Sequence, residues 1–220
     1  MLFRSTHTIY ASRLHRDLHF QVIANDIIGY ITSPDAGERI AKAVAQHADK
    51  LDIIVHNAGV TRDQLLLRMS EDDFTSVIDT NLTGAFRVVQ RATKGMMRLK
   101  RGRIVLVSSV VGLLGSPGQV NYAASKSGLV GMARSITREL GARGVTANVV
   151  APGYIDTEMT QQLSEDLQDS YRKAIPAGRF AEPEELAAAV AFLASDDSSF
   201  MTASTFLVDG GISSAYVTPL

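Results

Sequence analysis

The sequence predicts an α/β fold, in which helices cover both faces of an open, doubly wound sheet of parallel strands. Short apolar runs rich in β-branched residues alternate with longer stretches of helical periodicity. The apolar runs are continuous, as expected for parallel strands that are buried on both faces. The chain has 220 residues, of which 45% are hydrophobic, so it can bury one sizeable core. We expect one domain over residues 1–220, with an atypical N-terminal segment in residues 1–30 and the regular pattern in residues 31–220.

Four apolar runs bounded by turn formers are the expected strands. They comprise residues 51–55, 103–107, 144–150 and 204–208. Residues 21–31 could hold a further short strand.

The segments between the strands predict helices, and their ends carry recognisable signals. The expected helices comprise residues 35–48, 70–99, 122–140 and 183–194. Ser70 and Asp73 resemble a capping box at the start of the second helix, and Pro183 stands where a first-turn proline belongs. Gly141 and Gly144 are expected to stop the third helix.

Composition excludes several classes of function. The formal net charge is −1, so nothing suggests a general affinity for nucleic acid or for an acidic membrane surface. The chain has no cysteine, which excludes disulfides, thiolate metal sites and cysteine nucleophiles, and fits a reducing cytoplasm. It has no run of 18 apolar residues, and residues 1–10 do not resemble a signal peptide. We expect a cytoplasmic protein without a metal site.

Tyr122 and Lys126 are the first candidates for chemistry. They stand four residues apart on an expected helix, so their side chains project from the same face. A tyrosine hydroxyl has an ordinary pKa near ~10, and a nearby ammonium group lowers that pKa toward the working range of an acid–base catalyst. A tyrosine and a lysine at this spacing also occur on many helices by chance.

Other polar residues are expected near this pair. Ser109 follows the end of an expected strand, and Asn57, Ala58 and Gly59 directly follow another. In open α/β sheets, ligands bind beyond the carboxyl ends of the strands. Each residue has an ordinary alternative as a loop hydroxyl or a turn. Asn81 interrupts a helical stretch, where it could hold a water, bend the helix or be a tolerated surface residue.

Together with Pro152 and Gly153, these residues resemble the short-chain dehydrogenases/reductases, in order and approximate spacing. The resemblance covers residues 31–211 and implies a Rossmann-like fold. Within that family, the stretches HNAGVTRDQLLLRM, NYAASKSGLVGMARS and VTANVVAPGYIDTEMT are most similar to the 3-oxoacyl-[acyl-carrier-protein] reductases of fatty-acid biosynthesis.

The resemblance implies four catalytic roles. Tyr122 protonates the developing alkoxide while a hydride arrives from the nicotinamide, and Ser109 hydrogen-bonds the substrate carbonyl. Lys126 lowers the pKa of Tyr122 and binds the nicotinamide ribose. Asn81 holds a water that links Lys126 to solvent.

The resemblance also implies contacts to a nicotinamide cofactor, with NADP(H) expected rather than NAD(H). The implied cofactor-binding residues are Asn57, Ala58, Gly59, Tyr122, Lys126, Pro152, Gly153, Ile155 and Thr157. Residues 156–179 are expected to form a substrate lid.

Two kinds of partner follow from the same resemblance. Arg143, with Lys100 or Arg101, is expected near the site entrance to meet an acidic acyl carrier protein; a plain solvated surface is the alternative. Helices within residues 81–100 and 122–140 are expected to pair in a homodimer or homotetramer.

The sequence departs from the family in its first thirty residues. The family begins with a strand and a glycine-rich turn that binds the cofactor pyrophosphate, whereas the first glycine here is Gly29, and Tyr30 replaces an acidic residue. The fold is therefore expected to be N-terminally incomplete. The chain could be a fragment or mis-started reductase with foreign residues 1–29, a variant that binds cofactor through its nicotinamide half, or a member that has lost catalysis. The intact catalytic residues favour the first.

Three functions are therefore compatible with the sequence. The first is reduction of a 3-oxoacyl thioester, and the second is a reaction of the same family on another alcohol or ketone. The third is a non-catalytic protein that keeps only the oligomer surface.

Overall fold

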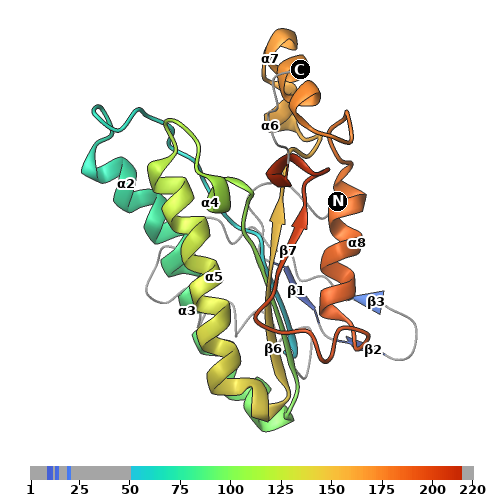
Figure 1. Ribbon diagram of the computed structural model, residues 1–220. Coiled ribbons are helices and arrows are strands. Elements are labelled where there is room, and N and C mark those ends of the chain that lie inside the picture. Colours follow the sequence, from blue (N-terminus) through green and yellow to red (C-terminus); the bar gives the residue numbers. More distant parts are fainter. Residues whose placement is uncertain (1–8, 12, 15–18, 21–50, 215–220) are drawn as a thin grey trace.

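The computed structural model describes residues 9–11, 13–14, 19–20 and 51–214 (Figure 1). Four parallel strands form the centre of its main sheet: β4 (Ile53–His56), β5 (Gly102–Val107), β6 (Val145–Pro152) and β7 (Thr205–Val208). All four correspond to expected strands, so the predicted parallel α/β fold is confirmed. The expected helix over residues 35–48 and the short strand within residues 21–31 lie outside the described residues.

The sheet has the order β1-β4-β5-β6-β7, and its first strand runs against the others. Strand β1 (Ile9–Ala11) pairs with β4 in antiparallel fashion. Two further short strands, β2 (Arg13–Leu14) and β3 (His19–Phe20), form a separate antiparallel pair.

The expected second helix is present and changes its winding part-way. It consists of α2 (Glu71–Ile78), the π-helical turn η2 (Asp79–Thr83) and α3 (Gly84–Leu99). The predicted cap at its start is confirmed, because the Ser70 hydroxyl accepts a hydrogen bond of 3.1 Å from the Asp73 backbone N–H.

The third expected helix, α5 (Val120–Leu140), ends in the single 3₁₀ turn η3 (Gly141–Arg143). Gly144 follows with a φ of 73°, and a side chain there would collide with the Lys100 carbonyl oxygen. The fourth helix, α8 (Pro183–Ala194), has Pro183 in its first turn, as predicted.

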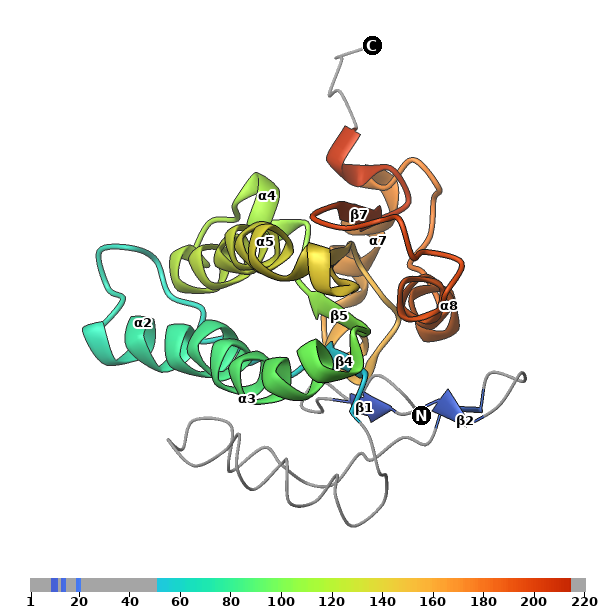
Figure 2. The ribbon, with the colours of Figure 1, turned by 90° about the horizontal axis from the view of Figure 1, so that it is seen from below.

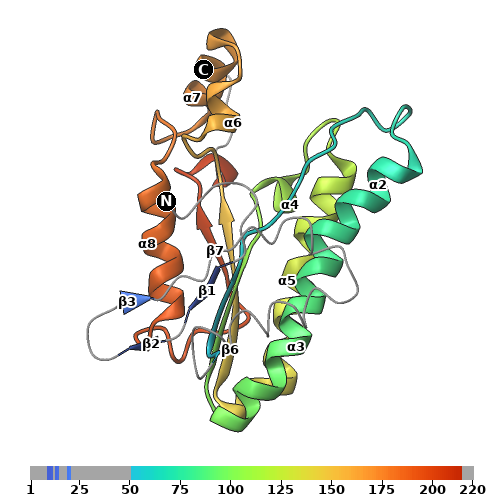
Figure 3. The same ribbon diagram turned by 180° about the vertical axis from the view of Figure 1, so that it is seen from behind.

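The helices cover the two faces of the sheet, as Figures 2 and 3 show. Helices α3 and α5 lie on one face, where Met96 and Leu129 pack against Leu106 and other strand residues. Helix α8 lies on the opposite face, and its Leu193 belongs to the core formed with Val105. None of the described helices is long and apolar enough to cross a membrane.

Short helices gather beyond the carboxyl ends of the strands (Figure 1). They are α4 (Val111–Leu114), α6 (Glu158–Gln161), α7 (Glu165–Ala174) and the 3₁₀ turn η4 (Ile212–Ser214). We call this side the carboxyl edge of the sheet.

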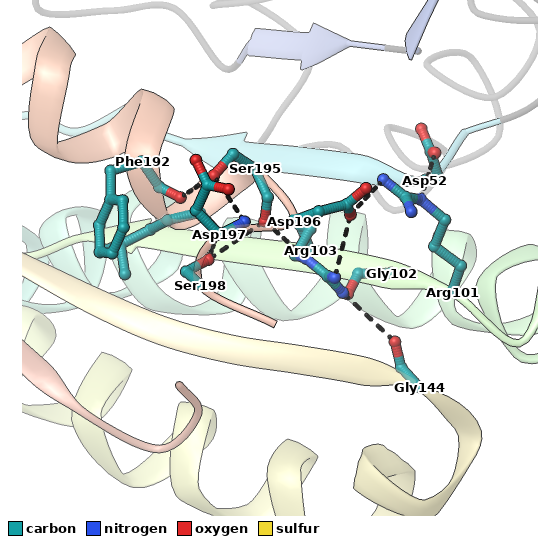
Figure 4. A network of polar contacts seen from close by, with 11 residues as sticks. Asp52, Arg101, Gly102, Arg103, Gly144, Phe192, Ser195, Asp196, Asp197 and Ser198 are labelled. Carbon is teal, nitrogen blue, oxygen red and sulfur yellow. Dashed lines mark hydrogen bonds and ion pairs between the residues drawn. The ribbon is translucent and has the colours of Figure 1, made fainter. Parts of the chain in front are cut away.

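An ion cluster closes the opposite, amino edge of the sheet (Figure 4). The Arg103 side chain is only 5% exposed and donates to the carbonyl oxygens of Ser195, at 3.1 Å, and Gly102, at 2.9 Å. Asp196 pairs with both Arg101 and Arg103. The cluster fastens the start of β5 to the loop that follows α8, so its charges are used in holding the fold.

Candidate active site

Ser109 and Tyr122 meet at the carboxyl edge. Ser109 lies two residues beyond the end of β5, where its hydroxyl accepts a 3.1 Å hydrogen bond from the Val111 backbone N–H. It also hydrogen-bonds the Tyr122 side chain, which projects from the first turn of α5. The neighbouring Ser108 is buried and donates instead to the Lys126 carbonyl oxygen. The structure therefore separates a structural serine from one that faces the tyrosine.

The Tyr122 hydroxyl is a weaker acid than the sequence predicts. Burial raises the pKa of Tyr122 to about 12, the hydrogen bond from Ser109 lowers it, and the charge of Asp63 raises it further. The Lys126 ammonium lies 5.6 Å from the centre of the Tyr122 ring. The expected lowering of the Tyr122 pKa by Lys126 stays a prediction.

Lys126 is buried in the same place. Its side chain is 3% exposed, and its Nζ donates a 2.8 Å hydrogen bond to the Val107 carbonyl oxygen at the end of β5. Burial lowers the pKa of Lys126 to about 8. This hydrogen bond uses one of three N–H donors, so the ammonium can still bind neighbouring hydroxyl groups.

Asn81 joins the loop after β4 to helix α5. It is fully buried in η2; its Oδ1 accepts from the Val60 N–H at 2.8 Å, and its Nδ2 donates to the Val60 carbonyl and the Ser125 hydroxyl at 3.0 Å. A surface residue is therefore excluded. The expected disturbance of the helix is present as a π-helical turn, which often occurs at functional sites.

Gly59 allows the loop after β4 to approach these residues. A Cβ atom at this position would lie 3.3 Å from both the Asn81 Oδ1 and the Lys126 Nζ, which is tighter than ordinary contact. Ala58 beside it is buried, and Asn57 is partly buried at the end of β4. The predicted Asn57-Ala58-Gly59 segment is thus placed beside Lys126.

The turn after β6 lies beside the loop of Ser109, because the Val110 N–H donates a 2.9 Å hydrogen bond to the Pro152 carbonyl oxygen. Gly153 packs so closely on β7 that a Cβ atom would lie 2.8 Å from the Asp209 Cα. Ile155 is buried and forms a bridge with Ala181, while Thr157 caps the short helix α6.

Comparison with known proteins agrees with this geometry. A family model described as enoyl-(acyl carrier protein) reductase matches residues 9–213. The chain is 45% identical over 182 residues to the 3-oxoacyl-[acyl-carrier-protein] reductase FabG of Vibrio cholerae, covering 83% of this chain and 75% of that protein. It is 50% identical over 182 residues to the reductase MabA of Mycobacterium avium, covering 83% and 71%. The chain belongs to the short-chain dehydrogenase/reductase family.

The structure adds a residue to this reductase site that sequence reasoning missed. His56, the last residue of β4, is fully buried and hydrogen-bonds the backbone of Asn81. Burial, followed by the charge of Lys126, lowers the pKa of His56 to about 3, so its imidazole is neutral at physiological pH. The sequence signal that could have revealed His56 is its position at a strand end, directly before Asn57.

The structure also adds an aromatic stack of Tyr154, Tyr171 and Phe180 at the expected lid, which we call the tyrosine stack. Tyr154 follows Gly153, and its ring centre lies 4.3 Å from that of Tyr171 on α7 and 5.8 Å from that of Phe180. None of the residues of α7 is fully buried, and the stack is one of its apolar contacts, beside the buried Ile175 at its C-terminal end. Part of the expected lid, residues 156–179, is thus held against the turn after β6.

Lys100, Arg101 and Arg143 do not lie near the site entrance of their own chain, so their expected placement is wrong within one chain. Lys100 caps the C-terminus of α3, Arg101 pairs with Asp52 and Asp196, and Arg143 lies in η3. All three precede β5 or β6 and lie at the amino edge, whereas Tyr122 lies at the carboxyl edge. Strand β5 separates the edges, because six extended residues span roughly 20 Å.

Proposed function

We propose that this chain reduces a 3-oxoacyl thioester, carried on an acyl carrier protein, to the 3-hydroxyacyl form with NADPH. The observation that carries the proposal is the meeting of Ser109, Tyr122 and Lys126 at the carboxyl edge of the sheet. The identities of 45% and 50% to 3-oxoacyl reductases over most of the chain support the substrate class.

The bound cofactor supplies a hydride to the ketone carbon. Tyr122 donates its proton to the ketone oxygen, so the carbonyl π bond is replaced by one C–H and one O–H bond. With the pKa of Tyr122 at about 12, the hydroxyl is protonated at neutral pH and is ready to act as the donor. Ser109 hydrogen-bonds the same oxygen while negative charge develops on it.

The residues around Lys126 fit the nicotinamide riboside half of this cofactor. The buried ammonium retains donors for the two ribose hydroxyls, and Gly59 leaves room beside it. The turn at Gly153 and Ile155, which follows Pro152 beside the loop of Ser109, would support the nicotinamide ring. Asn81 keeps the loop after β4 in place through its three hydrogen bonds.

We propose that two copies of the chain pair through α3 and α5. Phe86 and Met97 on α3 are 50% and 37% exposed, so this helix leaves apolar side chains uncovered. Helix pairing between copies would cover both.

The test is consumption of NADPH with a 3-oxoacyl thioester. The wild-type chain is expected to reduce the substrate. Tyr171→Phe is the control and is expected to do the same, because it keeps its aromatic stack. Tyr122→Phe is expected to lose activity by at least about a hundredfold, since it lacks the transferable proton. Equal rates for Tyr122→Phe and wild type would contradict the proposal.

A second candidate is a family reductase that acts on another substrate. The matching family model is named for an enoyl reductase, so the substrate panel includes a trans-2-enoyl thioester and a cyclic ketone. A rate with either that exceeds the 3-oxoacyl rate would transfer the function to that class. A stable oligomer with no activity on any of them would favour the non-catalytic alternative.

A further inference from the structure

The first strand of the sheet runs in the wrong direction to form a dinucleotide-binding turn. Ile9 lies opposite Val55 and Ala11 opposite Ile53, so the chain enters β1 at the carboxyl edge and leaves it at the amino edge. Ser109, Tyr122 and Lys126 all lie at the carboxyl edge.

A dinucleotide needs the opposite arrangement. Its pyrophosphate is held by backbone N–H groups in a glycine-rich turn, which follows a parallel strand at the carboxyl edge and opens a helix. Glycine is required there because the phosphates approach the backbone closely. In this chain, the strand beside β4 carries its continuation away from that edge.

The sequence of this segment agrees with the pairing. Residues 1–28 contain no glycine, so none of them can supply the close backbone approach that the pyrophosphate needs. Residues 1–28 therefore do not fit the pyrophosphate and adenosine half of NAD(P)H, whereas the described residues around Lys126 fit its nicotinamide half.

The nicotinamide half, in contrast, fits the residues around Lys126, Gly59 and Gly153. The Lys126 ammonium is 3% exposed and lies next to Gly59, where a Cβ atom would come within 3.3 Å of it. Gly153 packs against β7 through a backbone hydrogen bond of 2.9 Å to the Val208 carbonyl. These contacts do not depend on β1.

We infer that this chain recognises its cofactor through the nicotinamide riboside half alone and takes reduced nicotinamide mononucleotide about as well as NADPH. The inference rests on the proposed reductase function and deepens it by naming the part of the cofactor that is bound. Within the part of the chain that the structure describes, the antiparallel strand β1 would offer the adenosine half of NADPH no glycine-rich turn.

The test is a binding titration of the full chain with three ligands: NADPH, reduced nicotinamide mononucleotide and 2′-phospho-ADP-ribose. Nicotinamide fluorescence reports binding of the first two, and competition reports the third. We expect the first two dissociation constants to agree within about fivefold, and 2′-phospho-ADP-ribose not to compete. A pyrophosphate cradle with only two charge-assisted hydrogen bonds would favour NADPH by at least about a hundredfold.

A substitution checks that both ligands use the same residues. Lys126→Met is expected to weaken NADPH and the mononucleotide by the same factor, whereas Lys94→Met, on the exposed side of α3, leaves both unchanged. Tighter binding of NADPH by a hundredfold, or competition by 2′-phospho-ADP-ribose, would overturn the inference and leave the reductase proposal standing. If neither nicotinamide compound bound at millimolar concentration, both would fail.

Discussion

Replacing Lys126 with methionine is expected to stabilise the folded chain relative to wild type in a pH-dependent way, while abolishing reductase activity. Methionine keeps an apolar side chain of similar length in a site where the wild-type side chain is 3% exposed. The gain arises because the folded protein buries a charge that the unfolded chain leaves in water.

The magnitude follows from the pKa of Lys126, which burial lowers from 10.5 to about 8. At about 1.36 kcal/mol per unit of pKa, the charged side chain costs the folded state about 3 kcal/mol at pH 7. The folded state binds fewer protons than the unfolded state between pH 8 and 10.5, so wild-type stability rises with pH in that window. By pH 9.5 the cost has fallen to about 1.4 kcal/mol.

A second effect opposes the first and does not depend on pH. The variant removes the 2.8 Å hydrogen bond to the Val107 carbonyl, which costs about 1–2 kcal/mol. At pH 7 the variant is therefore expected to be more stable than wild type by about 1–2 kcal/mol. The difference shrinks by about 2 kcal/mol between pH 7 and pH 9.5, whatever the cost of the hydrogen bond.

Urea denaturation of wild type and Lys126→Met at these two pH values measures the change directly. Lys94→Met is the control for loss of one positive charge from the chain, since Lys94 lies on the exposed side of α3. A free-energy difference between wild type and Lys126→Met that stays constant from pH 7 to 9.5 would refute the reasoning, because it would mean that the burial of this ammonium costs nothing.

Three further predictions concern residues other than Lys126 and Lys94. His56→Asn should flatten the loss of stability in acid. Since the pKa of His56 falls from 6.5 to about 3 on folding, wild type is expected to lose about 2.3 kcal/mol between pH 6.5 and 4.5 in urea denaturation. The same loss in His56→Asn would contradict this. Tyr171→Leu should break the tyrosine stack, so that protease cuts α7 faster and the KM for substrate rises. Tyr171→Phe should keep the cleavage rate and the KM at wild-type values. Equal protection of α7 in the two variants would exclude the stack as an anchor. Gly144→Ala should lower the free energy of unfolding by at least about 1 kcal/mol in the same assay, because φ is 73° and the added Cβ would collide with the Lys100 carbonyl oxygen. Gly141→Ala should leave it unchanged, because no atom lies within 4 Å of its Cβ position. Equal urea midpoints for the two variants would contradict the steric argument.

The strands and helix ends could be predicted because their signals are local. Runs of β-branched residues specify β4 to β7, Ser70 caps α2 through a bond to the Asp73 N–H, and Pro183 fits a first helical turn. Each depends on side chains within a few residues. The family motif likewise marked the residues that meet at the carboxyl edge.

The features that were missed depend on distance and burial. The role of His56 depends on Asn81, which is 25 residues away in sequence, and its low pKa depends on complete burial. The pKa of Tyr122 follows the same rule, since burial outweighs the lowering by its hydrogen bond to Ser109. Sequence spacing reveals which groups can meet but not how much water they retain.

The misplaced basic residues show a different limit. Arg101 and Ser109 are eight residues apart, yet strand β5 puts them at opposite edges of the sheet. Counting about 3.3 Å per strand residue would have shown this from the sequence. The family resemblance carried these positions over without that check.

Hydride transfer to the ketone carbon of a 3-oxoacyl thioester, with the proton from Tyr122, is tested most directly with NADPH deuterated at the transferred position and mass analysis of the product. We expect a 3-hydroxyacyl thioester with one deuterium at carbon 3 from wild type, and almost none from Tyr122→Phe in the same time. A hydroxyacyl product without deuterium, or no hydroxyacyl product from wild type, would contradict the proposed reaction.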